Sequence, residues 1–395
     1  MTVSSMNTKT TFPLITLQPA FDSGNAWVAL LLDAEQPLDN AGLAHVLEDF
    51  VLAETLAEIP CVVQADPLRI DPGLAADLPR DRLILRFPYE QGADPASREA
   101  LAALRKAGFG LMASGMPTGD ASLAPEISAL AVPCPGNSAP ESLIDWLRRL
   151  PGPHLALGTT DKVCPGFCRF HWLAGHIAGM AVPTFKGDPT ARSLLLKLLS
   201  LVTRDAESAE IEALIKRDAN LAYKLLKLVN SVAFMPGRHI ESFSQALVLL
   251  GRRQLQRWLM LLLFARPPGS QTASPLLPQA ALRANLLEGI AKRKGLGRDD
   301  WDHAFMIGMF SLLDTLFGQP LADVIAPLNL SDEVKQALLE GHGQFGAFLQ
   351  AARAGEGTPT PALATVLAGI GLDNEAWGSA LSEAARWAVM VSKEA

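Results

Sequence analysis

The stretch LLKLVNSVAF at residues 225–234, followed by IESFSQALVLLG at residues 240–251, decides the fold of the C-terminal half. Leucine and valine recur at helical spacing up to Asn230, whose short polar side chain competes for local backbone groups and ends a helix. Ser242 opens a capping box ahead of a second apolar run, and Gly251 ends that run. The pattern predicts two amphipathic helices joined by a short connector.

The rest of the C-terminal half, from residue 191 onward, continues the helical periodicity. Predicted helices cover 193–202, 206–217, 219–229, 242–250, 252–265, 277–293, 299–317, 331–340, 346–354 and 374–392. The entirely apolar run 258–265 is far shorter than the ~20 residues needed to span a membrane. It therefore predicts a buried core helix, and no membrane span is expected.

The N-terminal half alternates short apolar runs with helical patterns. Predicted strands are 14–17, 27–32, 61–64, 83–87, 109–113, 128–132, 154–158 and 177–182, and predicted helices are 43–57, 96–107, 138–150 and 163–174. Such alternation favours a parallel sheet with crossover helices. The number of units suits a small (β/α)₈ barrel of the TIM type, and an open doubly wound sheet is the alternative.

Composition narrows the class of protein. Of the 395 residues, 49% are hydrophobic, which is enough for large cores. Four cysteines in so long a chain indicate a reducing compartment, and residues 1–11 have no apolar core of the signal-peptide kind, so we expect a disordered tail and a cytoplasmic protein. The first 191 residues carry a net charge of −8 and the remainder +1. Neither half has the basic balance of a nucleic-acid binder.

The motif at 225–251 resembles the signature of the HDOD domain: a leucine-rich helix ending in Asn-Ser, an Ile-x-Ser start, an Ala, then Leu-Gly. HDOD domains resemble metal-dependent HD phosphohydrolases that have lost their metal ligands. The N-terminal half is similar to the EAL domains of bacterial EAL–HDOD signalling proteins, through Gln18-Pro19-Ala20-Phe21-Asp22, Gly108-Phe109-Gly110 and Gly179. The resemblance implies a degenerate EAL-like barrel at 12–190 and a helical HDOD domain at 191–395, with a connector near 185–192 rich in Pro and Gly.

Active EAL domains hydrolyse cyclic di-GMP with two divalent metals held by acidic residues. Carrying that pattern onto this chain places its ligands on Ala29, Gln64, Arg86, Ser114, Gly115, Ala131, Pro133, Leu157, Thr160 and Ala178. None of these is a carboxylate, and an arginine at a ligand position repels a cation. The resemblance therefore implies that the barrel has no catalytic or metal-binding residues and needs no cofactor.

The helical half shows the same loss. No histidine in the chain is followed by aspartate, and the family's His-Asp pair falls on Ser311 and Leu312 within 305–313. Asp302-His303 has the reverse order and is predicted to lie on the first turn of a helix. Asn230 is interpreted as a helix-end anchor and not as a ligand contact.

Two clusters offer alternative chemistry. Acidic residues near predicted strand ends are interpreted as solvated loop carboxylates, with a rebuilt metal site as the alternative; they are Asp33, Asp66, Glu90 and Asp161. Cys164, Cys168 and His171, with His176 beyond, have spacing that one helix face could present to zinc, but Pro165-Gly166 interrupts that helix. Buried free cysteines are the favoured interpretation.

The sequence therefore predicts a catalytically inactive signalling protein that acts as an interaction scaffold or sensor in cyclic-dinucleotide or stress signalling. Expected partners are other signalling proteins, a nucleotide second messenger bound without hydrolysis, and a second copy of the chain. One alternative is a DNA-binding regulator that uses residues 246–258, where two helices meet at Gly251 and Arg252, Arg253 and Arg257 follow. The other alternative is a metal-dependent phosphohydrolase with a rebuilt site.

Overall fold

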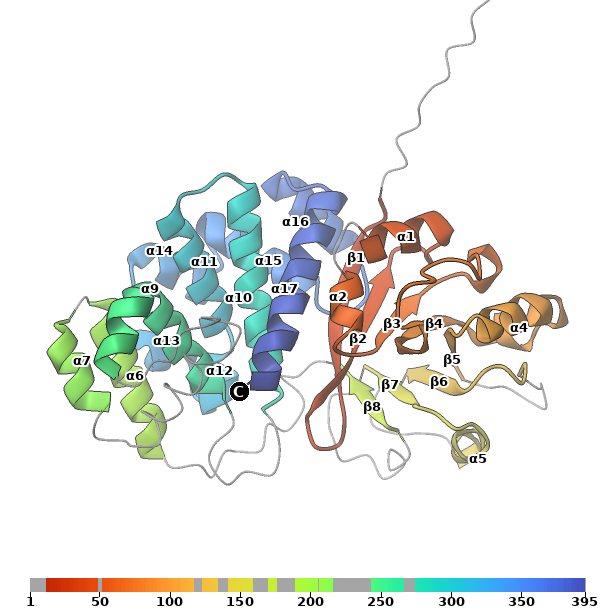
Figure 1. Ribbon diagram of the computed structural model, residues 1–395. Coiled ribbons are helices and arrows are strands. Elements are labelled where there is room, and N and C mark those ends of the chain that lie inside the picture. Colours follow the sequence, from red (N-terminus) through yellow and green to blue (C-terminus); the bar gives the residue numbers. More distant parts are fainter. Residues whose placement is uncertain are drawn as a thin grey trace, which may run out of the picture.

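The computed structural model describes the chain in segments. They are residues 12–48, 52–116, 123–133, 141–158, 170–175, 189–204, 206–215, 243–265 and 274–394. Figure 1 shows a barrel of strands beside a bundle of helices, with α17 (Asn374–Glu394) at the boundary between the two.

The strands of the N-terminal half close into a barrel in sequence order. They are β1 (Ile15–Phe21), β2 (Trp27–Ala34), β3 (Cys61–Gln64), β4 (Leu83–Pro88), β5 (Gly110–Ser114), β6 (Ala129–Pro133), β7 (Leu155–Leu157) and β8 (Trp172–Ala174). Closure confirms the predicted barrel and excludes the open sheet. β1 is antiparallel to both β2 and β8, whereas the other neighbouring strands pair in parallel.

The antiparallel β1 corrects the expectation of a purely parallel sheet. β1 and β2 are joined by a turn, in which the Asp22 carboxylate accepts hydrogen bonds from the backbone N–H groups of Gly24 and Ala26. Antiparallel strands can be joined by a tight turn, whereas parallel strands need a long crossover. A second correction concerns Trp172–Ala174, which is strand β8 although 163–174 was predicted as helix. The predicted strand 177–182 lies outside the described residues.

Helices surround the described part of the barrel. They are α1 (Asn40–Glu48), α2 (Leu52–Leu56), α3 (Tyr89–Ala93), α4 (Arg98–Lys106) and α5 (Glu141–Arg149), with the 3₁₀ turns η1 (Pro67–Arg69), η2 (Arg80–Arg82) and η3 (Pro95–Ser97). Strand side chains alternate between the barrel interior and this outer layer. Half of the buried residues in the interior cluster are alanines, such as Ala20, Ala29 and Ala131, which suits the narrow bore of an eight-stranded barrel.

The C-terminal half is helical throughout its described residues, as predicted. Its elements are α6 (Pro189–Thr203), α7 (Ser208–Ile215), α9 (Phe243–Phe264), α10 (Leu276–Arg293), α11 (Arg298–Phe310), α12 (Leu313–Phe317), α13 (Leu321–Ile325), η6 (Ala326–Leu328), α14 (Asp332–Leu339), α15 (Gly343–Ala354), α16 (Pro361–Ile370) and α17. The sequence did not predict α13 or α16. The predicted helix 219–229, Asn230 and Ser242 lie outside the described residues.

Two glycines shape this bundle. Gly251 has a left-handed backbone (φ 72°) and bends α9, as predicted from its position after the apolar run. Gly308 lies where α11 crosses α10, and a Cβ at this position would come within 2.4 Å of the Ala284 Cα atom. The absence of a side chain at Gly308 therefore allows the two helices to pack closely.

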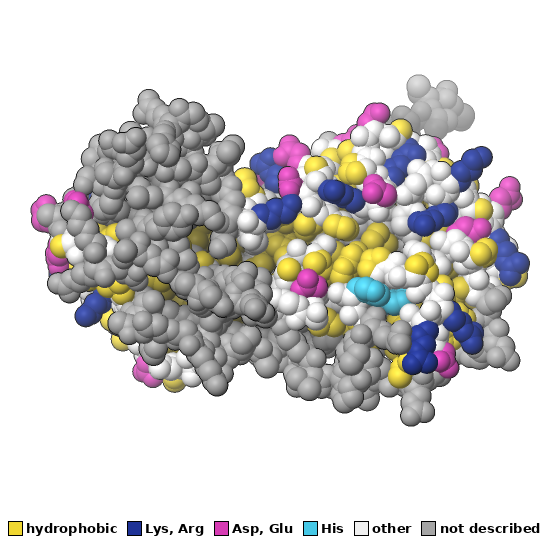
Figure 2. Space-filling model, turned by 60° about the horizontal axis from the view of Figure 1, so that its bottom comes forward, with side chains coloured by type: hydrophobic (Ala, Val, Ile, Leu, Met, Phe, Trp, Pro, Cys, Tyr) yellow, Lys and Arg dark blue, Asp and Glu magenta, His cyan; other side chains and the backbone are white. Residues whose placement is uncertain are grey.

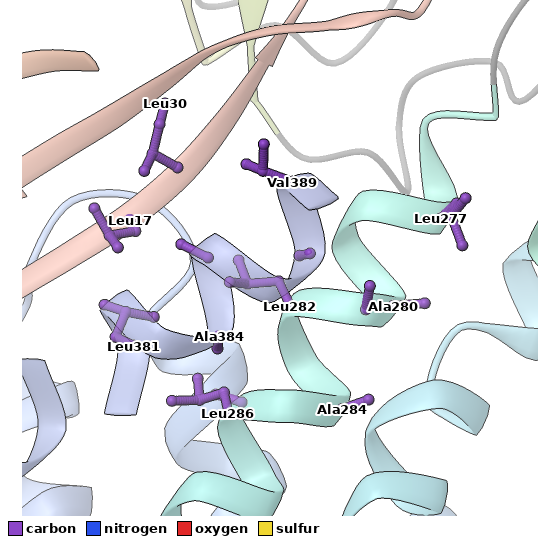
Figure 3. Packing of buried hydrophobic residues seen from close by; sticks show 14 of the residues in the cluster. Leu17, Leu30, Leu277, Ala280, Leu282, Ala284, Leu286, Leu381, Ala384 and Val389 are labelled. Atoms are coloured by element: carbon purple, nitrogen blue, oxygen red, sulfur yellow. The ribbon is translucent and has the colours of Figure 1, made fainter. Parts of the chain in front are cut away.

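The barrel and the helical half share one hydrophobic core. Figure 3 shows Leu17 and Leu30 of the barrel facing Leu381 and Val389 of α17, with α10 beside that helix on the side away from the strands. The outer face of β1 and β2 is thus covered by a helix from the far end of the chain. The domain boundary at 190/191 stays a prediction, but these two halves are in extensive apolar contact.

Polar contacts reinforce this interface. The Trp377 indole, 0% exposed, donates a hydrogen bond of 2.8 Å from Nε1 to the Ile15 carbonyl oxygen. Asn374 donates to the Phe12 carbonyl oxygen at 3.0 Å. Arg386 also pairs with Glu54. Since exposed ion pairs contribute little to stability, the buried contacts of α17 dominate.

Among the described residues, no single helix is both long enough and apolar enough to cross a membrane. The bent pair Arg298–Phe317 and Leu321–Leu328 meets both criteria only when its two segments are taken together.

Candidate functional site

The end of the barrel at which β2, β3 and β4 finish carries polar side chains on adjacent strands. Asp33 ends the inward-facing row of β2, while Gln64 and Arg86 are register partners on β3 and β4. β1 runs the other way, so Thr16 near its start pairs with Asp33. This end of the barrel, where the parallel strands have their carboxyl ends, is called the mouth below.

Asp33 and Arg86 form a buried ion pair at the mouth. Their exposed fractions are 3% and 6%, and Arg86 donates from Nη2 to the Asp33 carboxylate. Burial raises the pKa of Asp33, and the Arg86 charge opposes this effect. Asp33 is therefore not the solvated loop carboxylate that the sequence suggested. It points into the barrel because it continues the inward alternation of β2 beyond Leu31.

A cavity of about 350 Å³ opens over this pair and has walls from both halves. Its lining from the barrel comprises Leu17, Gln18, Pro19, Asp33, Arg86, Leu157, Gly158 and Gly175, and its lining from the helical half comprises Gln279, Ala354, Glu356, Gly357, Thr358 and Thr360. The volume lies in the range of small-molecule sites. The helical half thus forms one wall of the site at the barrel mouth.

Residues 355–360, between α15 and α16, bring the helical half to the mouth. The Thr16 hydroxyl of β1 donates to the Gly357 carbonyl oxygen. Arg283 of α10 forms a bidentate pair with Glu356 and also donates to the Ser311 hydroxyl at 2.9 Å. Because Arg283 is 8% exposed, this pair is shielded from solvent and holds the segment firmly.

The described ligand positions implied by the EAL resemblance do lie along the inner wall or at the strand ends. Ala29 faces the barrel interior, Gln64 and Ser114 end their strands, and Arg86 and Leu157 line the cavity. Thr160 and Ala178 lie outside the described residues. No group of three or more His, Cys, Asp or Glu side chains among the described residues has the geometry of a metal site. At one of the implied ligand positions Arg86 carries a positive charge, which disfavours a metal ion there, and it pairs with Asp33.

The other acidic residues near strand ends do not converge on the mouth. Asp66 caps η1 by accepting a hydrogen bond from the Leu68 N–H group, and it also accepts one from Gln91 at 3.0 Å. Glu90 is exposed in the first turn of α3. Asp161 lies outside the described residues.

The cysteine–histidine cluster is described only at His171. That side chain is exposed, and its Nδ1 accepts a hydrogen bond of 3.1 Å from the His154 backbone N–H. Cys164, Cys168 and His176 lie outside the described residues. The zinc alternative therefore stays a prediction.

The positions on which the HDOD resemblance places the family's His-Asp pair lie between two helices. Ser311 and Leu312 interrupt the predicted helix 299–317 between α11 and α12. The Ser311 hydroxyl donates to the Gly308 carbonyl oxygen and accepts from Arg283, and Leu312 is buried. Asp302 and His303 lie at the start of the second turn of α11 and not in its first turn, because the helix begins at Arg298.

The helix-turn-helix alternative has the predicted bend, and the three arginines that follow the bend all have partners among the described residues. Arg252 donates to the Ala206 carbonyl oxygen at 2.6 Å, and Arg253 pairs with Asp299 and Asp302. Arg257 pairs with Glu288 and Asp302, each at 3.0 Å. On the face seen in Figure 2, basic and acidic side chains are interspersed over the described part of the barrel. These arginines hold α9 to its neighbours, so the DNA-binding alternative is not favoured.

Sequence analysis missed the residues of the helical half that complete the site. Gln279 and Arg283 are buried on α10, and Glu356 follows α15. One signal was available, since an arginine inside an apolar stretch such as Ala280–Ala284 needs a buried partner. The identity of that partner depends on tertiary packing.

Comparison with known proteins agrees with the C-terminal assignment. Residues 189–322 match the HDOD domain family. The uncharacterised protein YuxH of Bacillus subtilis is 37% identical over 130 residues, which are 32% of this chain and 31% of YuxH. The cyclic di-GMP phosphodiesterase CdgJ of Vibrio cholerae is 30% identical over 189 residues, which are 48% of this chain and 43% of CdgJ. The matched parts thus span less than half the length of these relatives.

Among solved structures, the EAL domain of Mycobacterium smegmatis DcpA is similar with 16% identity and a TM-score of 0.30, covering 41% of this chain and 89% of that domain. A likeness of this size carries no argument about function. The C-terminal match does carry a conclusion: this chain contains an HDOD domain at residues 189–322, next to a closed eight-stranded barrel, and it has a relative named for cyclic di-GMP.

Proposed function

We propose that this protein is a catalytically inactive signal-transduction protein of the EAL–HDOD type, in which the barrel mouth and the HDOD half act together as a sensor or scaffold. The buried Asp33–Arg86 pair carries this proposal. A guanidinium at an expected ligand position neutralises the neighbouring carboxylate, so the pair supplies neither a metal ligand nor a general base. The name of the Vibrio relative supports a place in cyclic di-GMP signalling.

The loss of the His-Asp pair in the helical half supports the same proposal. Ser311 joins a hydrogen-bonded chain with Arg283 and Glu356 that ends at the barrel mouth. The positions that hold catalytic metals in the HD phosphohydrolases would in this protein link the two halves through hydrogen bonds. We propose that its partners are other signalling proteins, which would bind to the surfaces of the two docked halves.

The test is a hydrolysis assay on the full-length protein. Purified protein is incubated with cyclic di-GMP and Mg²⁺ or Mn²⁺, with an active EAL phosphodiesterase as positive control, and products are separated by chromatography. We expect no product above the protein-free background. Metal-dependent turnover that disappears in Asp33→Asn but persists in Asp66→Asn would refute the proposal, since Asp66 is the matched carboxylate at a strand end that does not line the cavity.

A further inference from the structure

The Arg86 guanidinium has unused hydrogen-bonding capacity inside the inter-half cavity. Of its five N–H donors, the one interaction seen among the described residues is the pair that Nη2 makes with Asp33. The side chain is 8% exposed and lines the cavity. The remaining N–H groups border the cavity, so they can donate to a molecule that enters it.

Gln279, on the opposite wall of the cavity, has a side-chain amide that makes no hydrogen bond within the described residues. It is 7% exposed, lies in the first two turns of α10 and lines the same cavity, and its side chain has no hydrogen-bond partner in the described segments. Its amide is therefore available to a molecule in the cavity. Arg86 and Gln279 belong to different halves, so a molecule that satisfied both would bridge the interface.

The chemistry of the lining selects the bridging group. The carboxylates in the wall, Asp33 and Glu356, already accept hydrogen bonds from Arg86 and Arg283. The unfilled groups are therefore mainly donors: the guanidinium N–H groups, the Gln279 amide and the exposed Thr358 hydroxyl. Fixed donors around a small cavity are complementary to an oxyanion, which guanidinium groups bind with two parallel hydrogen bonds.

Asp33 also supports an anionic occupant. Burial raises its pKa, so its carboxylate holds a negative charge less firmly than an exposed aspartate would. An arriving oxyanion can take over Arg86 while Asp33 takes up a proton from the solvent, and the buried charge stays balanced.

We propose that the cavity binds a small molecule carrying a carboxylate or phosphate oxyanion, which Arg86 and Gln279 hold from the two halves. This inference rests on the proposed signalling function, because the signal that the protein senses would be the binding of this molecule at the mouth. A ligand that contacts both walls binds the docked arrangement in preference to any undocked one. Binding therefore strengthens the attachment of residues 355–360 to the mouth.

The test uses the full-length protein with inorganic phosphate, acetate and cyclic di-GMP as probes, measured by calorimetric titration and by the shift in melting temperature. We expect at least one probe to bind and to raise the melting temperature; the phosphate and acetate arms distinguish the two oxyanion classes. Gln279→Met preserves side-chain length but removes the amide, and it should weaken binding about tenfold, as loss of one hydrogen bond to a charged group does. Gln254→Met, the same change at an exposed position of α9, should bind as the wild type does.

A second variant removes the barrel side of the site without leaving an unpaired buried charge. The double substitution Asp33→Leu with Arg86→Met replaces both charges by apolar groups, which protein folds often tolerate, and it should abolish binding. Absence of binding by all three probes would overturn the inference. So would binding that survives either Gln279→Met or the double substitution unchanged. Binding together with metal-dependent hydrolysis would instead refute the proposed inactivity and leave the bridging site standing.

Discussion

Trp377 provides a direct test of whether the two halves share one cooperative core. Its indole is fully buried on α17 and donates to the Ile15 carbonyl oxygen of β1, 362 residues away in the chain. Gly355 lies against the same ring, since a Cβ at this glycine would come within 2.6 Å of Cζ2. We choose Trp377→Phe because it keeps an aromatic ring on α17 and removes the N–H donor.

The expected cost has two parts. Loss of the donor leaves the buried Ile15 carbonyl without this partner, at about 1–3 kcal/mol. The smaller ring leaves unfilled space beside Gly355, which adds about 1 kcal/mol. We therefore expect the free energy of unfolding to fall by about 2–4 kcal/mol. The matched control is Trp387→Phe on the same helix, whose ring packs at 79° against Phe305 within the helical half.

The assay is urea denaturation of both variants followed by circular dichroism. Trp387→Phe should cost less than about 1.5 kcal/mol, because its ring contact is retained in part. The wild type should unfold in one transition, and Trp377→Phe should move that entire transition. The reasoning is refuted if Trp377→Phe changes the unfolding free energy no more than Trp387→Phe does, or if the wild type shows two transitions of which the substitution moves one.

Gly308→Ala should destabilise the protein by about 3 kcal/mol or more, because its Cβ would overlap the α10 backbone. The control Gly369→Ala lies in open space on α16 and should stabilise the protein by about 0.5–1 kcal/mol. Thermal melts that gave equal effects for the two variants would contradict the packing of α10 on α11. Burial lowers the pKa of His154, whose Nδ1 accepts a hydrogen bond from the Leu130 N–H group. The unfolded chain therefore binds more protons than the folded chain below about pH 6.5, and the free energy of unfolding should fall as the pH falls through that value. Unfolding curves that show the same pH dependence in His154→Gln would count against this assignment. Residues 191–395 expressed alone should be helical but should melt lower than the full chain, since the barrel covers part of α17; a fragment as stable as the intact protein would show that the shared core is dispensable.

Local patterns predicted most elements of both halves. The Cys61–Gln64 strand and the Leu276–Arg293 helix agree with their predicted ranges to within a residue, because alternation and 3.6-residue periodicity record which face of an element is buried. The errors fall where that record is weak. Trp172–Ala174 is only three residues long, and its place between β7 and β1 is decided by barrel closure.

The candidate site shows the same division. Sequence reasoning placed Arg86 at a ligand position of the barrel, and the structure places it at the mouth. The sequence did not indicate that Asp33, 53 residues earlier, would neutralise it, nor that Gln279 and residues 355–360 would form the opposite wall. Each of these relationships joins residues on different elements, and no local spacing encodes them.

The sequence by itself therefore determined the class of each half: strands alternating with helices, then helices alone with an HDOD motif. Tertiary structure decided that β1 reverses, that α17 covers the barrel, and that the mouth is shared between the halves. The physical reason is that periodicity specifies the apolar face of an element but not the surface that covers it. That surface is selected by burial of apolar area and by pairing of buried charges across the whole fold.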